Sequence, residues 1–296
     1  MIPLVLTLKN DRFTASVTSV GAELLSLKNR DGLEYMWQKD PKYWGKTSPV
    51  LFPIVGNLRN DKVTFHGTEY GMAKHGLCRA AEFTVESHSD TDAVFSLCSS
   101  EETLAHYPYQ FKLTLAYHLS ETGISITYTV ENIDNQPIDF CFGAHPGFNV
   151  PLEGVGTFSD YRLEFNADEP DGCPVFDFEN NQINMDKRVD FMKGSRTLPL
   201  DYSYFDEDAL VFDKVHSDRV RLVSDKTERG VEVRFADFDF VAFWTPIKMD
   251  APFLCIEPWC GMAVCSDEGD TFEEKRGVKH LETGASRSFV MEILPF

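Results

Sequence analysis

The chain has 296 residues, 43% of them hydrophobic and 13% aromatic, so it can bury a large core and is not an intrinsically disordered protein. Its 28 lysines and arginines oppose 47 aspartates and glutamates, which gives a formal net charge of −19. Such a surface generally repels duplex nucleic acid and anionic membranes, so we expect a small neutral or weakly charged molecule as partner, and neither nucleic acid nor a membrane.

The chain begins with a run, Met1–Lys9, that predicts a first strand and has neither the basic leader nor the apolar core of a signal peptide. No apolar run approaches ~18 residues, so we expect no transmembrane helix. The expected location is the cytoplasm.

Alternation of apolar and polar residues dominates the rest of the chain. At 111–119 the odd positions are apolar, and after Glu121-Thr122-Gly123 the pattern resumes at 124–130, which predicts a hairpin with one buried face. Similar runs predict strands at 12–18, 62–66, 81–87, 92–98, 161–166, 208–214, 218–224, 230–236, 240–244 and 286–293. Helical signals are few: a capping box at 99–102 opens one short helix, and 40–44 suits a single turn. We predict one all-β domain, residues 1–296, built as a large antiparallel sandwich or barrel with few short helices.

The seven cysteines favour a reducing compartment, because their number is odd and they are spread along the chain. Cys255, Cys260 and Cys265 recur every five residues, which is not the spacing of a zinc site, and no Cys-x-x-Cys occurs. We expect reduced thiols that behave as small buried hydrophobes in a cytoplasmic protein.

Four segments interrupt the alternation, and we look for chemistry there: 48–61, 74–79, 142–148 and 253–262. Each places an ionisable residue beside glycine or proline among apolar or aromatic neighbours. Such punctuation ends regular strand pairing and re-aims the backbone.

Glu257 is the most informative single residue, because an apolar run precedes it and Pro258-Trp259 follow. A carboxylate that emerges from a buried strand beside a tryptophan would be desolvated, which raises its pKa toward the range of a general base. It could equally be a glutamate at a strand end that faces solvent or an arginine. His145 lies in a Gly-Ala-His-Pro-Gly turn, where it either projects into a cleft as a proton donor or bonds the backbone.

Other candidates carry less information alone. His75 and Arg79 flank a Gly-Leu-Cys bend and could recognise a hydroxyl-rich or anionic ligand, or form a surface ion pair. Arg59 and Asn57 belong to the first irregular segment, and Trp259 could stack on a sugar ring or simply fill the core. No His-x-His or His-Glu-x-x-His spacing supports a metal, and no nucleotide-binding loop or serine-hydrolase elbow occurs.

Taken together, the irregular segments resemble one known family. The motifs that carry this resemblance are Leu-Phe-Pro-Ile-Val-Gly at 51–56, His-Gly-Leu-Cys-Arg at 75–79, Ala-His-Pro-Gly-Phe at 144–148 and Ile-Glu-Pro-Trp-Cys-Gly at 256–261. In order and approximate spacing, the chain is similar to the aldose 1-epimerase (galactose mutarotase-like) family, and most of all to its LacX-type branch. The resemblance covers nearly the whole chain and implies a large antiparallel β-supersandwich.

The resemblance also implies the reaction, which is interconversion of the α and β anomers of a free hexose by an isomerase. By this resemblance, Glu257 is the base and His145 the acid, while His75 holds and polarises the sugar. An arginine in the first loop contacts sugar hydroxyls. No metal or organic cofactor is implied.

The chain departs from the family pattern at two places. Asn57 stands where many LacX-type sequences carry arginine after the glycine, and Arg59 would take over that role if the segment were a strand, since residues two apart share a face. The substrate-binding aspartate has two candidates, Asp206 and Asp208, after Tyr204-Phe205.

Three alternatives remain open at this point. A carbohydrate-binding or regulatory module without turnover is suggested by Asn57. A hexose-phosphate mutarotase would need clustered cations, for which Arg59, Arg79, Lys74 and Lys62 lie near the irregular segments. A glycosidase is less favoured, because Glu257 has no acidic partner in an equivalent setting. The oligomeric state is open, with a homodimer as one option.

Overall fold

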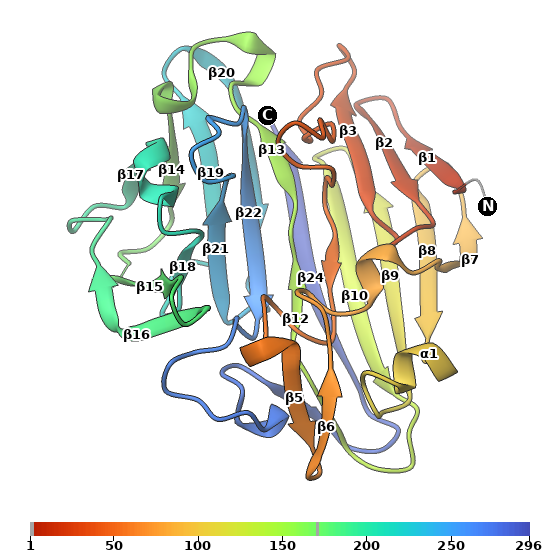
Figure 1. Cartoon of the computed structure of the whole chain (residues 1–296). Helices are drawn as coiled ribbons and strands as arrows, with labels where there is room; N and C mark the ends of the chain where they lie inside the picture. Colours follow the sequence, from red (N-terminus) through yellow and green to blue (C-terminus); the bar gives the residue numbers. More distant parts are fainter. Residues whose placement is uncertain (1–2, 170–171) are drawn as a thin grey trace.

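Antiparallel β-strands dominate the computed structural model, which describes residues 3–169 and 172–296 (Figure 1). The largest sheet has nine strands, in the spatial order β17 (Thr197–Pro199), β14 (Tyr161–Phe165), β19 (Arg219–Ser224), β20 (Thr227–Arg234), β24 (Ser286–Pro295), β10 (Ile124–Asn132), β9 (Phe111–Leu119), β8 (Asp92–Cys98) and β7 (Thr84–His88). The predicted hairpin is confirmed as β9 and β10, in which Tyr128 lies opposite Leu115. Apolar residues of these strands are buried at alternate positions, as a sheet with one covered face requires.

A second sheet covers that face. Its order is β18 (Leu210–Phe212), β21 (Phe240–Trp244), β22 (Phe253–Cys260), β12 (Phe142–Ala144) and β4 (Val50–Leu51), and β13 (Gly147–Asn149) also pairs with β22. Phe142 of this sheet stacks on Phe289 of β24 with ring centroids 5.3 Å apart, and it also contacts Tyr128 of β10. The two sheets therefore enclose a shared apolar core, as in a sandwich.

Smaller elements surround this sandwich. One sheet has three strands, β1 (Val5–Lys9), β2 (Phe13–Thr18) and β3 (Leu24–Asn29). Three sheets have two strands each: β5 (Lys62–Phe65) with β6 (Thr68–Gly71), β15 (Cys173–Asp177) with β16 (Gln182–Val189), and β11 (Ile138–Phe140) with β23 (Lys279–Leu281). The helices are short, namely α1 (Glu101–Leu104) and the 3-10 turns η1 (Arg59–Asp61), η2 (Cys78–Ala80), η3 (Leu152–Gly154), η4 (Phe158–Asp160), η5 (Tyr202–Phe205) and η6 (Phe272–Glu274).

The all-β prediction with few short helices is confirmed. The predicted capping box opens α1, with Ser100 as its N-cap, and a turn closes where the amide of Trp44 donates to the carbonyl of Asp40. The first strand starts later than expected at Val5, and Met1 and Ile2 of the predicted run lie outside the described residues. All seven cysteines are free, and six are buried while Cys98 is exposed. In the described ranges, no helix is both long and apolar enough to span a membrane.

One expectation needs correction, because β22 does not end at its Glu-Pro pair. All eight residues of Phe253–Cys260 are buried, and the strand runs straight through Glu257 and Pro258. The strand survives because its partner is interrupted at the same place. β13 pairs with Cys255 and β12 with Trp259, so no regular pairing on that side needs an N–H from Pro258.

Candidate active site

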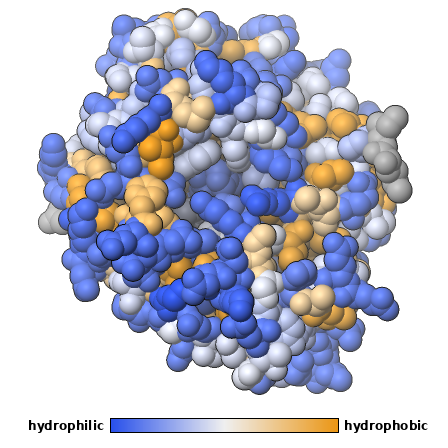
Figure 2. Space-filling model, in the orientation of Figure 1, coloured by the Kyte–Doolittle hydropathy of each residue, from blue (hydrophilic) through white to orange (hydrophobic). Residues whose placement is uncertain are grey.

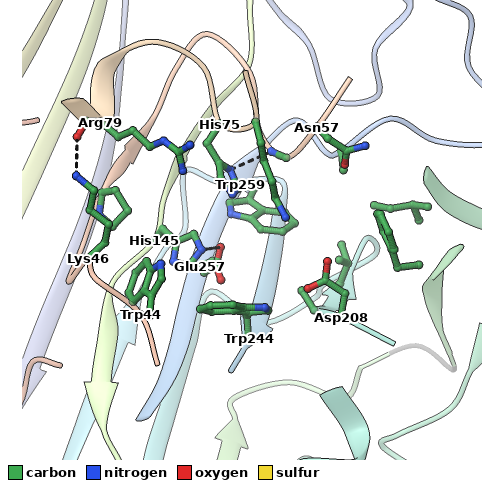
Figure 3. Close-up of a pocket in the computed structure, with 18 of the residues that line it drawn as sticks. Trp44, Lys46, Asn57, His75, Arg79, His145, Asp208, Trp244, Glu257 and Trp259 are labelled. Atoms are coloured by element: carbon green, nitrogen blue, oxygen red, sulfur yellow. Dashed lines mark hydrogen bonds and ion pairs between the residues drawn. The ribbon is translucent and has the colours of Figure 1, made fainter. Parts of the chain in front are cut away.

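A cavity of ≈ 240 Å³ opens on one side of β22, and it is visible as a hollow in the face shown in Figure 2. Polar and aromatic side chains converge on it from both halves of the chain (Figure 3). Those used below are Trp44, Lys46, Asn57, Lys74, His75, Arg79, His145, Asp208, Trp244, Glu257 and Trp259. A small concave site with a few converging polar groups is the usual form of a small-molecule site.

The interrupted pairing of β22 places the two central side chains. Glu257 and Trp259 are two residues apart on one strand, so both point to the cavity face. His145 lies in the break between β12 and β13, opposite this part of β22, and the amide of Ile256 donates to the carbonyl of Pro146 there. The His-Pro-Gly turn therefore brings the imidazole to the carboxylate, while Ala242 of β21 lies opposite Glu257 on the other side.

The resulting pair is close and almost completely buried. His145 Nε2 lies 3.2 Å from Glu257 Oε2, and the residues are 7% and 1% exposed. Three of the pair's polar atoms, His145 Nδ1 and both carboxylate oxygens, have no hydrogen-bond partner among the described residues. Buried polar atoms normally have partners, so this arrangement costs stability and points to a ligand-binding role.

Burial shifts both groups toward their neutral forms. It raises the pKa of Glu257 well above its ordinary value, although the charge of Lys74 and the indole of Trp259 oppose that shift. Burial likewise lowers the pKa of His145 to about 3, and the charges of Lys74 and Arg79 add to this. The pair can therefore hold one proton between a carboxyl group and an imidazole.

Aromatic rings fix the imidazole of His145. Trp44 stacks on it with centroids 4.8 Å apart, and Trp244 meets it edge-on at 5.6 Å. The Trp44 carbonyl accepts a 2.8 Å hydrogen bond from the indole of Trp37. Trp259 reaches the cavity because Gly143 lies opposite it, where a Cβ would come within 2.8 Å of the indole. These rings exclude water from the pair and offer apolar faces to a ligand.

His75 is held with a defined tautomer. Its Nδ1 accepts a 3.1 Å hydrogen bond from the amide of Gly56, so a neutral ring carries its proton on Nε2. Burial lowers the pKa of His75 well below its ordinary value, with the charges of His145, Lys74 and Arg79 adding to the effect. Gly56 has φ +68, and a Cβ there would lie 2.4 Å from Ala263, so only glycine fits this contact.

The structure separates the other predicted residues into two groups. Arg79, Asn57 and Asp208 line the cavity, and the Asn57 amide also donates to the carbonyl of Asn181 in the β15–β16 turn. Asp206 does not line the cavity and is exposed at the end of η5. Of the two candidate aspartates, the structure brings only Asp208 to the site.

Arg59 also lies outside the cavity lining. Its guanidinium pairs with Asp270 at 2.8 Å and donates to the carbonyl of Cys265. The expectation that it shares a face with Asn57 is wrong, because residues 59–61 form the turn η1 and the preceding Gly56 has a positive φ. The two-residue period of a strand does not apply to such a segment.

Three metal-ligating side chains meet at this site. One ligand atom each from His145, Cys255 and Glu257 lies within 4.8 Å of the others. Burial raises the pKa of the Cys255 thiol well above its ordinary value, which disfavours the thiolate that binds metals. The described residues therefore suit proton transfer better than metal binding.

Sequence reasoning missed several cavity residues, namely Trp44, Lys46 and Trp244. Trp44 is the last residue of the predicted turn at 40–44, Lys46 belongs to the loop that follows it, and Trp244 ends β21. The tryptophans were recognisable as stacking candidates, but only tertiary contacts show which of them reach the site.

Comparison with known proteins supports the similarity noted in the sequence. A family model described as "Aldose 1-epimerase" matches residues 4–273. The plasmid-encoded protein LacX of Lactococcus lactis is 36% identical over 278 residues, which cover 92% of this chain and 93% of that protein. A galactose mutarotase related enzyme from Lactobacillus acidophilus has a TM-score of 0.93 at 30% identity, covering 99% of this chain and 97% of the other. A galactose mutarotase-like protein from Lactobacillus casei has a TM-score of 0.92 at 28% identity, covering 99% of this chain and all of the other.

Proposed function

The chain belongs to the aldose 1-epimerase family, and we propose that it is an isomerase that interconverts the α and β anomers of an aldose. The observation that carries this proposal is the buried pair of His145 and Glu257, 3.2 Å apart, in which His145 Nδ1 and both carboxylate oxygens have no hydrogen-bond partner among the described residues. Membership of the family supports a sugar as the bound molecule.

The reaction needs one proton acceptor and one proton donor on a sugar ring. Glu257 accepts the proton of the C1 hydroxyl while His145 donates a proton to the ring oxygen, and the bond between C1 and the ring oxygen breaks to give the open-chain aldehyde. Rotation about C1–C2 presents the other face of the aldehyde. The ring oxygen then attacks C1, and both protons move back, which restores the pair and inverts the anomeric centre.

The pair's protonation fits a reversible exchange. Burial favours a neutral carboxyl group and a neutral imidazole, which together hold one proton. Moving that proton to His145 gives the carboxylate and imidazolium that start the reaction as written. The indole of Trp259 favours this second form, because it lowers the pKa of Glu257, whereas Lys74 lowers the pKa of both groups. Each general acid or base contributes typically ~10²–10⁴-fold to a rate.

His75 and Asp208 complete the proposed site. The Nε2–H of His75 donates to a sugar oxygen, since its Nδ1 is occupied by the amide of Gly56. The Asp208 carboxylate accepts from sugar hydroxyls on another side of the cavity. The faces of Trp44, Trp244 and Trp259 contact the apolar side of the ring.

Anomer exchange tests the proposal directly. Freshly dissolved α-glucose and α-galactose are followed by polarimetry or by NMR of the anomeric protons, with and without the protein. We expect faster equilibration that His145→Asn lowers by ~10²-fold or more, and that His88→Asn, at an exposed histidine, leaves unchanged. Full activity in His145→Asn contradicts the mechanism. Saturable sugar binding without acceleration would instead identify a carbohydrate-binding module.

We also propose that residues 1–296 form one folding unit in a reducing compartment, the cytoplasm. The nine-stranded sheet supports the first point, because β7 near residue 85 and β24 near residue 290 belong to it. Seven free cysteines support the second.

A further inference from the structure

Three positively charged side chains line the cavity, namely Lys46, Lys74 and Arg79. Lys46 follows the turn at 40–44, whereas Lys74 and Arg79 lie between β6 and the end of η2. Lys46 Nζ donates to the main-chain carbonyl of Arg79 at 3.2 Å. Figure 3 shows these two residues together on one side of the cavity, with the guanidinium of Arg79 directed toward His75 and with Asp208 on the opposite side.

These cations are not neutralised by the protein. None of the three forms an ion pair with a carboxylate of the described residues, whereas Arg59 pairs with Asp270 and Lys62 with Glu69. The contrast is marked in a chain with 47 acidic and 28 basic side chains. Three cations that line one cavity without a carboxylate partner give it a positive potential, which favours the binding of an anion.

The segments that carry Lys46 and Arg79 are held firmly. The buried carboxylate of Glu23 accepts hydrogen bonds from the amides of Thr47 at 2.5 Å and Ser48 at 3.0 Å, directly after Lys46. The backbone of Arg79 packs so closely on Gly21 that a Cβ there would lie 2.9 Å from the Arg79 carbonyl. The backbone segments that carry Lys46 and Arg79 are therefore fixed before a ligand arrives, which lowers the entropic cost of binding it.

Two of these cations, Lys74 and Arg79, lie within electrostatic reach of the reacting pair. The charges of Lys74 and Arg79 lower the pKa of both His75 and His145. In the proposed reaction His145 donates a proton to the ring oxygen. In a pyranose the ring oxygen is bonded to C5, and C5 carries C6. A substituent on C6 therefore lies on the same side of the sugar as the group that protonates the ring oxygen.

We infer that the preferred substrate is an aldose with an anionic group on its last carbon, bound by Lys46, Lys74 and Arg79 while C1 lies at His145 and Glu257. This inference rests on the proposed function for the position of C1. A phosphate and a carboxylate share the required chemistry. A guanidinium with two ammonium groups binds either through charge-assisted hydrogen bonds.

NMR exchange spectroscopy tests the inference, because it measures α–β exchange at equilibrium and needs no pure anomer. Glucose and galactose are compared with their 6-phosphates and with glucuronate and galacturonate. We expect kcat/KM to be about tenfold higher or more for at least one charged class, and this preference to shrink with added salt. A preference for the 6-phosphates alone identifies phosphate as the anion. A preference for both charged classes shows that the site accepts either anion. Neutral sugars that react as well as both charged classes overturn the inference and leave the proposed function intact.

Matched lysine variants sharpen the test. Lys46→Gln should lower the ratio of charged to neutral kcat/KM by about tenfold. Lys42→Gln, four residues earlier on the exposed part of the same loop, should leave that ratio unchanged. An unchanged ratio in Lys46→Gln overturns the inference.

A binding measurement separates the inference from the proposed function. Hexose and hexose 6-phosphate are titrated calorimetrically into Glu257→Gln, which requires no turnover. Tighter binding of the phosphate, lost when Lys46→Gln is added, supports the anion site even if no sugar exchanges faster. Equal binding of both sugars counts against the site, whatever the turnover of the unmodified protein.

Discussion

Two buried glutamates in this molecule have opposite surroundings. Glu268 Oε1 accepts from Lys275 Nζ at 2.9 Å and Oε2 from the amide of Arg276 at 3.1 Å, and the side chains of the lysine and glutamate are 2% and 6% exposed. Glu257 is as deeply buried, but its neighbour is His145, and neither carboxylate oxygen has a hydrogen-bond partner among the described residues. The first carboxylate is satisfied and the second is not.

The difference indicates what each pair is for. A buried ion pair with satisfied oxygens holds its loops in place, and breaking it exposes one charge to an apolar interior. A buried carboxyl group without partners gives no such support and persists only because the surrounding strands hold it. We therefore expect substitutions at Glu257 to affect activity, and substitutions at Lys275 to affect stability.

The largest effect is expected from Glu257→Gln. The amide keeps the shape of the side chain but cannot exchange the proton, so kcat/KM for anomer exchange should fall by ~10²–10⁴-fold. Stability should not fall. The pKa of Glu257 is raised in the folded state, so the unfolded chain loses this proton at a lower pH than the folded protein does. The stability that protonated Glu257 contributes is therefore present below the ordinary pKa of a glutamate and is lost as the pH rises through the folded-state pKa.

Thermal unfolding of Glu257→Gln checks that sign. Glutamine does not titrate, so its melting temperature relative to the unmodified protein should increase from about pH 5 to pH 8. Glu69→Gln, at an exposed partner of Lys62, serves as the control for both activity and stability. A variant that melts well below the unmodified protein at pH 8 would show that Glu257 is a structural residue.

Lys275→Met should give the reverse result. Removing the ammonium group leaves the Glu268 carboxylate buried with only one hydrogen bond, which costs about 3–5 kcal/mol of unfolding free energy. The double variant Lys275→Met/Glu268→Gln should recover part of this loss. Lys62→Met removes an exposed partner and should cost at most about 1 kcal/mol.

Urea unfolding and anomer exchange, measured on the same samples, distinguish the two pairs. Where Lys275→Met remains folded, its kcat/KM should stay within about threefold of the unmodified protein, because Lys275 does not line the cavity. A much larger loss of activity at full stability would remove the contrast between the two glutamates.

The pH dependence gives a further test of the catalytic pair. Exchange needs one proton shared by His145 and Glu257. A second proton binds to His145 only near its pKa of about 3. The shared proton is lost only above the raised pKa of Glu257. For a neutral aldose, kcat/KM should therefore show no titration at about pH 4.3, where an ordinary glutamate titrates, and should fall at higher pH only where Glu257 loses its proton. A titration of kcat/KM at about pH 4.3, in protein that remains folded, would contradict this assignment.

Histidine NMR provides an internal control for this expectation. Exposed His280 hydrogen-bonds Asp139, which raises its pKa. Its ring signals should shift with pH above the ordinary imidazole range, while those of His145 stay constant down to about pH 5.

Regular regions of the fold followed from the sequence more readily than the site did. The hairpin at 111–119 and 124–130 was predictable because one face of it is buried and the other is not, which gives a clear period of two. β22 is buried on both faces, and β12 and β13 have three residues each, so neither the length nor the alternation of these strands is visible.

The site itself depended on contacts that no local pattern records. His145 and Glu257 were singled out by their Gly and Pro neighbours and by family resemblance, yet their 3.2 Å contact arises from the break between two strands that pair with the same partner. Trp44 and Lys46 precede Thr47 and Ser48, whose amides donate to Glu23, 24 and 25 residues away in the sequence. Such long-range contacts have no periodic signature.

Arg59→Gln is expected to have the smallest effect on activity. It tests directly whether a local strand pattern can identify a residue of the site. If the segment around Asn57 were a strand, Arg59 would take the sugar-binding role of an arginine in this first irregular segment. In the structure Arg59 instead pairs with Asp270 outside the cavity. Arg59→Gln should therefore change kcat/KM less than about threefold and cost about 1–3 kcal/mol of stability, because the carbonyls of Glu268 and Cys265 lose a donor. Arg79→Gln, at an arginine that lines the cavity, should reduce kcat/KM more strongly for a charged aldose. If Arg59→Gln instead raised KM about tenfold at full stability, Arg59 would have to leave Asp270 and reach the sugar, and the first loop would rearrange on binding.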